Sequence, residues 1–173
     1  MSQEFFLIDS NALITPYLQF YPFDLAPGFW SQIEGHIKDG SIRILDVVRA
    51  EILQGKETDD LKLWMDGISV DIIDRREQEI LEKYAAVIQY LQSSPLYKPS
   101  ALAEWSRGTV ADPWLIATAA VYHYTLITFE EPSGGLSIKT PNKVAKIPDI
   151  ANEFGVKTQS LYYLMRSLGF KLS

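Results

Sequence analysis

The chain has 173 residues, of which 47% are hydrophobic, and a net charge of −6 at neutral pH, so we expect one globular domain over residues 1–173. It has no cysteine, two histidines and no glycine-rich phosphate loop, which argues against disulfides, zinc sites, serine-histidine-aspartate triads and P-loop chemistry. It shows neither a signal-like N-terminus nor an apolar run long enough to span a bilayer, so we expect a cytoplasmic protein without membrane association.

The first predicted elements alternate between strand and helix. Residues 4–9 (EFFLID) form a short apolar run that ends in an acid, which predicts a buried strand. Residues 10–21 predict a short helix, and residues 27–40, which begin with proline and end with glycine, predict a longer one. A second strand over residues 41–48 then leads into a helix over residues 47–55.

The second half of the chain continues this alternation. Residues 67–73 (GISVDII) favour a third strand, and residues 74–92 predict a long helix in which Asp74 and Glu77 have capping-box spacing. The later expected elements are a loop over 93–101, a helix from Asp112, a strand over 124–129, a glycine- and proline-marked connection over 132–144 and two short C-terminal helices. This order predicts an α/β fold, a three-layer α/β/α sandwich with a mainly parallel central sheet.

Four carboxylates are expected at one edge of that sheet. Asp9 ends the first strand, and Glu51 lies near the start of the helix after the second strand. A helix of about 10 residues from Asp112 advances roughly 15 Å, and the next strand returns roughly 20 Å, which brings Glu130 back beside Asp112. Ligands bind at the carboxyl edge of open α/β sheets, so the four acids predict a site there.

Four carboxylates in one crevice repel one another and need a cation or protons to offset the repulsion. Mg²⁺ and Mn²⁺ take oxygen ligands, and pairs of such ions support phosphodiester hydrolysis. Three of the acids also have an ordinary interpretation: Asp112 before proline as an N-cap, Glu51 as a solvated helix residue and Glu130 as a turn residue. Their order along the chain favours the metal site.

The acids lie in motifs that resemble those of PIN-domain ribonucleases, in order and at comparable spacing. These motifs are FLIDSN at 6–11, VVRAEIL at 47–53, ADPWLIATA at 111–119 and LITFEEP at 126–132, so the resemblance covers nearly the whole chain. The closing KIPDIANEFGV at 146–156 resembles a poorly characterised branch of that family, often regarded as the toxin of a toxin-antitoxin pair.

The resemblance implies Mg²⁺- or Mn²⁺-dependent cleavage of RNA and an antitoxin protein as partner. The residues carried over are Asp9, Glu51, Asp112 and Glu130 as the acidic site, with Asn11 and Thr128 as polar groups that orient ligands and water. Apolar and aromatic residues of the variable helices would otherwise face water, so an antitoxin contact or a homodimer is expected.

The chain departs from the family pattern at two places. Many relatives end the site with an aspartate, whereas this chain offers Glu130 or Glu131; Thr128 would share the face of Glu130 on an extended strand and favours it. Residues 93–108 look like an insertion between the second and third acids, which concerns the surface that faces the substrate.

The basic residues gather near the C-terminus. Residues 138–173 carry six Lys or Arg against two Asp or Glu, whereas the preceding part carries ten against twenty. Lys139, Lys143 and Lys146 follow the last acid, and we expect them to meet substrate phosphates. Asp149 either adds a carboxylate to the site or stabilises the first turn of a helix.

Two other functions compete with the nuclease. Residues 148–169 resemble a helix-turn-helix and would make the chain a DNA-binding module, although the second helix has few basic residues. A PIN-like fold kept for binding a partner without catalysis is the other, and the presence of all four acids disfavours it.

Overall fold

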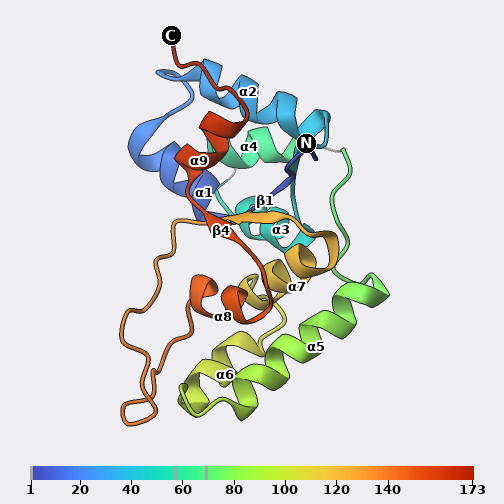
Figure 1. Ribbon diagram of the computed structural model, residues 1–173. Coiled ribbons are helices and arrows are strands. Elements are labelled where there is room, and N and C mark those ends of the chain that lie inside the picture. Colours follow the sequence, from blue (N-terminus) through green and yellow to red (C-terminus); the bar gives the residue numbers. More distant parts are fainter. Residues whose placement is uncertain (1, 57, 69) are drawn as a thin grey trace.

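The backbone is built around a four-stranded sheet in the order β2-β1-β3-β4, in which all neighbouring strands are parallel. Figure 1 shows the computed structural model, which describes residues 2–56, 58–68 and 70–173. The strands are β1 (Phe6–Ile8), β2 (Ile42–Arg43), β3 (Thr125–Ile127) and β4 (Thr158–Gln159). Every residue of β1 and β3 is buried, as expected for central strands of a parallel sheet covered on both faces.

Helices cover both faces of the sheet. In Figure 1, α1, α2, α4 and α9 lie on one side of the strands and α5, α6, α7 and α8 on the other. The helices are α1 (Asn11–Thr15), the π-helix η1 (Pro16–Phe20), α2 (Pro27–Lys38), α3 (Asp46–Leu53), α4 (Asp60–Asp66), α5 (Gln78–Ser93), α6 (Pro99–Trp105), α7 (Asp112–Tyr122), α8 (Ile147–Glu153) and α9 (Leu161–Ser167). The predicted three-layer α/β/α sandwich with a parallel sheet is confirmed.

The helix α7 is enclosed on all sides. It lies against β3, and α5 packs on its other side, so all residues from Pro113 to Ala119 are buried. This explains why its sequence is apolar around the whole circumference instead of along one stripe. The same packing fixes the N-terminus of α7, where Asp112 is the first helical residue.

The third predicted strand is wrong. In the described part of residues 67–73, from which Ser69 is excluded, the structure has one isolated bridge between Ile73 and Leu45 in place of a strand. The two short C-terminal helices that the sequence predicts are present as α8 and α9. They are joined through β4, which pairs with β3, so this segment does not have the arrangement of the competing helix-turn-helix at 148–169. The strand β4 was not predicted, since its two residues are polar and form no apolar run.

Helix starts differ from the prediction in detail. The Asp74 side chain accepts a hydrogen bond from the backbone N–H of Arg76 (2.9 Å), which closes a turn before α5. The N-cap of α5 is Glu77, whose side chain makes no capping bond, so the predicted capping box is absent.

In the part of the chain that the structure describes, no helix is both long and apolar enough to cross a membrane.

The end of α7 provides a test of this backbone. His123 has the left-handed conformation (φ 58°), with its N–H bonded to the carbonyl of Ala119. Since glycine adopts this conformation without a steric cost, we expect His123→Gly to raise the free energy of unfolding by about 1 kcal/mol. His123→Ala keeps a Cβ atom and should give no such gain. Urea unfolding of both variants measures the difference, and a glycine variant no more stable than the alanine variant would contradict it.

Candidate active site

The carboxyl edge of the sheet brings the four predicted acids into electrostatic contact. Asp9 directly follows β1 and is only 4% exposed, while Glu130 follows β3. Glu51 lies on α3, and Asp112 begins α7. The charges of Glu130, Asp9 and Glu51 all raise the pKa of Asp112, so the four side chains form one cluster, named here the acidic cluster.

Burial is the main cause of the raised pKa values in the acidic cluster. Desolvation, followed by the charges of the other acids, raises the pKa of Asp112 to about 7. Desolvation also raises the pKa of Asp9 to about 6, against a hydrogen bond from Thr128 that acts in the opposite direction. The surrounding protein therefore compensates the negative charges of the ionised Asp9 and Asp112 side chains poorly.

Thr128 organises the centre of the acidic cluster. Its Oγ1 donates to Asp9 Oδ2 (2.8 Å) and accepts from the backbone N–H of Glu130 (3.1 Å). Asn11 Nδ2 donates to Thr128 Oγ1 (3.3 Å), and Asn11 Oδ1 accepts from the N–H of Phe129 (3.0 Å). Asn11 and Thr128 thus orient Asp9 and fix the chain that leads from β3 to Glu130.

Ser10 belongs to the site although the sequence analysis did not identify it. Its Oγ donates to Glu51 Oε2 (3.0 Å) and is itself buried, at 6% exposure. The bond ties the end of β1 to α3 across 41 residues of sequence. The position of this serine directly after the acid that ends β1 could have indicated a role in the site. Its hydrogen-bond partner Glu51, however, depends on how α3 packs against the end of β1.

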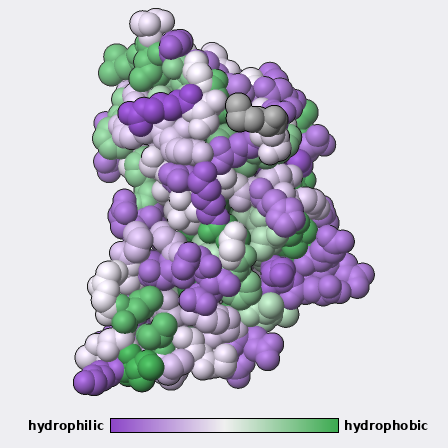
Figure 2. Space-filling view, viewed as in Figure 1, coloured by the Kyte–Doolittle hydropathy of each residue, from purple (hydrophilic) through white to green (hydrophobic). Residues whose placement is uncertain are grey.

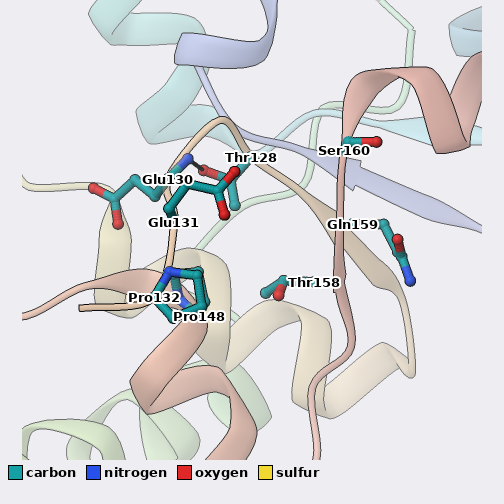
Figure 3. A pocket seen from close by; sticks show the side chains of 8 residues that line it. All are labelled: Thr128, Glu130, Glu131, Pro132, Pro148, Thr158, Gln159 and Ser160. Carbon is teal, nitrogen blue, oxygen red and sulfur yellow. Dashed lines mark hydrogen bonds between the residues drawn. The ribbon is translucent and has the colours of Figure 1, made fainter. Parts of the chain in front are cut away.

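Glu130 and not Glu131 faces the acidic cluster. Figure 3 shows the two side chains extending to opposite sides of the chain. Glu130 Oε2 accepts from the backbone N–H of Ile147 (2.7 Å), the first residue of α8. Glu131 is exposed, and both glutamates, with Thr158, Gln159 and Ser160, line a hollow of about 310 Å³, named here the β4 hollow.

Asp112 and Asp149 have different environments. The N-cap of α7 is Ala111, and Asp112 makes no side-chain capping bond, so its interpretation as a simple N-cap is wrong. Asp149 Oδ2 instead accepts from both the N–H (3.0 Å) and the Oγ (2.6 Å) of Ser133. Asp149 therefore stabilises the loop after β3, while Asp112 contributes its charge to the acidic cluster.

The three lysines are placed unequally. Lys146 is the N-cap residue of α8, and its charge lowers the pKa of Asp112, so it lies near the acidic cluster. Lys139 and Lys143 are exposed on the loop that runs beside α8 and away from the sheet (Figure 1). Near its end this loop is held by a hydrogen bond from Ser100 Oγ to the carbonyl of Lys143 (3.0 Å).

The chemistry of the acidic cluster fits a hard divalent cation. Its donors are carboxylate oxygens, and the raised pKa values of Asp9 and Asp112 indicate uncompensated negative charge. Within the described residues, however, no three histidine, aspartate or glutamate side chains are already grouped as ligands of one ion. The two observations are compatible, because Glu51 and Glu130 have flexible side chains whose present hydrogen bonds direct one oxygen of each elsewhere.

Comparison with known proteins gives a family for the chain. No curated protein matches it significantly. A family model described as "Domain of unknown function (DUF4411)" matches residues 6–172, a range that includes all four members of the acidic cluster. The chain therefore belongs to the DUF4411 family.

Proposed function

We propose that the chain is a Mg²⁺- or Mn²⁺-dependent endoribonuclease of the PIN-domain type, which hydrolyses RNA phosphodiester bonds at the acidic cluster. The observation that carries this proposal is the gathering of Asp112 with three other carboxylates from distant parts of the chain at the carboxyl edge of the sheet, where burial and their charges raise its pKa to about 7. Such an arrangement is costly for folding, and perturbed carboxylates gathered in one crevice are typical of functional sites.

In this proposal Asp9, Glu51, Asp112 and Glu130 hold the metal. When bound, the metal would activate water and stabilise the charge that develops on the phosphate. The hydrogen bond from Thr128 keeps Asp9 in one orientation, and Asn11 holds Thr128 and the turn at Phe129. These two residues therefore preorganise the site, since they fix the acids before substrate arrives.

The partners follow from the same resemblance. We propose that the protein acts as the toxin of a toxin-antitoxin pair in the cytoplasm and that an antitoxin protein or a second copy covers part of its surface. Several large apolar side chains are exposed, including Leu18, Leu25, Ile138 and Val144. Figure 2 shows hydrophobic residues gathered near both ends of the face in view, which is compatible with a partner contact there.

Substitution of the acids tests the nuclease. Asp9→Asn and Asp112→Asn should each lower metal-dependent RNA cleavage by about a hundredfold or more, the scale on which single electrostatic groups act in active sites. Glu130→Gln should have a similar effect, because its charge acts on both aspartates. Cleavage of a labelled RNA by purified variants measures these losses.

The matched control for this series is Glu131→Gln. It removes the neighbouring exposed carboxylate, whose charge is not among the main causes of the raised pKa values of Asp9 and Asp112, and should leave the stabilisation of the protein by Mn²⁺ nearly unchanged. Wild-type rates in the Asp9 and Asp112 variants would refute the nuclease. Loss of the stabilisation by Mn²⁺ on changing Glu131 instead of Glu130 would refute the assignment of the fourth acid.

The stability of the metal-free protein should fall as pH rises from about 4 to 8. Asp9 and Asp112 have pKa values of about 6 and about 7 against an ordinary value of 3.8, so in this range the folded state binds more protons than the unfolded state. Stability is therefore lost as these protons leave, by on the order of a few kcal/mol.

Comparison of the wild type with Asp112→Asn isolates this contribution from other titrating groups. The variant should lose less stability than the wild type between pH 5 and 8 in the presence of a chelator, because it lacks one of the two shifted carboxyls. Added Mn²⁺ should raise the melting temperature of the wild type more at pH 8 than at pH 5. Parallel stability curves for the two proteins would contradict the charge repulsion.

A further inference from the structure

A second hollow adjoins the acidic cluster on the side opposite the β4 hollow. It has a volume of about 420 Å³, and its wall includes Glu51 and Asp112 together with Arg75 and Arg107. We name it the arginine hollow. Glu51 lies on α3, which follows β2, whereas the β4 hollow is lined by the end of β4. Because β2 and β4 are the outer strands of the sheet, the two hollows flank the acidic cluster from opposite ends.

The two hollows differ in charge. The residues that line the β4 hollow include the carboxylates of Glu130 and Glu131 and, among the described residues, no lysine or arginine. Thr158, Gln159 and Ser160 present hydroxyl and carboxamide groups there. The arginine hollow has two guanidinium groups, which suit the oxygens of a phosphate. The outer strands β2 and β4 are three strand-to-strand spacings of about 4.8 Å apart, or roughly 14 Å in total. This distance is longer than a single small ligand and suits a polymer.

Arg75 is fixed in the wall of the arginine hollow. Its Nη1 donates to the carbonyl of Gly108 (2.9 Å), and its guanidinium carbon lies 5.4 Å from the centre of the Trp114 ring. Its Nε is 3.9 Å from Asp46 Oδ2. These contacts hold the charge of Arg75 in place beside the loop that leads to Asp112.

Arg107 is more readily available to a ligand. Its side chain is 62% exposed and pairs with Glu104 at 2.7 Å, one turn earlier on the surface. Exposed ion pairs of this kind contribute little to stability, so a phosphate can replace Glu104 as the partner of Arg107 at small cost. Arg107 also lies in the predicted insertion, which gives that insertion a place at the substrate.

We propose that a single strand of RNA crosses the acidic cluster, with the next backbone phosphate on one side of the cleaved bond in the arginine hollow, bound by Arg107 beside the fixed charge of Arg75, and with the nucleoside on the other side of that bond in the β4 hollow. This inference rests on the proposed ribonuclease function. A flexible single strand places one nucleotide in each of two separate hollows, whereas the rigid backbone of a duplex does not.

The test measures the affinity of a fluorescent oligouridylate in an Asp9→Asn background, which preserves the substrate and leaves the lining of the arginine hollow unchanged. Arg107→Gln should weaken binding about tenfold and make the salt dependence shallower by about one ion. Glu104→Gln should strengthen binding, because it frees Arg107 and removes a negative charge. The same RNA annealed to oligoadenylate should bind more weakly than the single strand.

The matched control is Arg76→Gln, which removes an exposed positive charge next to Arg75 but outside the arginine hollow. It should change affinity by less than about twofold, and thermal melting should show that both variants remain folded. Equal affinities for Arg107→Gln and Arg76→Gln, or equal binding of single strand and duplex, would overturn the placement of the RNA. Metal-dependent cleavage by the wild type is scored separately, so the proposed function can fail while the binding result stands, or the reverse.

Discussion

The burial of one carboxylate, Asp9, at the end of the central strand is the constraint on which the site depends. At 4% exposure Asp9 has lost most of its water, and its main compensation is the hydrogen bond from Thr128, which directly follows the neighbouring strand β3. That bond requires β1 and β3 to pair in register, with Ile8 opposite Ile127. The geometry of the acidic cluster is therefore inseparable from the pairing of the two innermost strands.

The rest of the fold holds the other acids against this centre. Because α7 is packed between β3 and α5, its N-terminus cannot move away from the sheet without opening the core, and Asp112 stays beside Asp9. Glu51 is tied to the end of β1 through Ser10, and Glu130 is tied to α8 through Ile147. Asp112 is thus positioned by packing of the backbone, and Asp9, Glu51 and Glu130 are held by hydrogen bonds of their side chains.

The sequence was informative wherever a single local rule decided the structure. Apolar runs predicted β1 and β3, and the parallel order of strands placed their terminal acids at one edge. The spacing from Thr128 favoured Glu130 over Glu131, and the two side chains extend to opposite sides of the chain. Features that depend on distant partners were not predictable. The polar residues of β4 become a strand only because β3 offers a free edge, and the contact of Arg75 with Gly108 joins segments 33 residues apart. Asp74 and Glu77 have the spacing of a capping box, but the Asp74 side chain accepts a hydrogen bond from Arg76 in the turn before α5 instead.

The bond between Glu130 and Ile147 links the acidic cluster to the backbone of another helix. While Oε2 accepts from the first amide of α8, Glu130 has one carboxylate oxygen left for any other partner. Ligation through both oxygens would draw Oε2 toward the cation, so it would weaken this bond and expose the Ile147 amide to exchange. The rate of hydrogen exchange at the Ile147 amide therefore distinguishes ligation of a cation by one oxygen of Glu130 from ligation by two, although this amide is part of α8 and not of the acidic cluster.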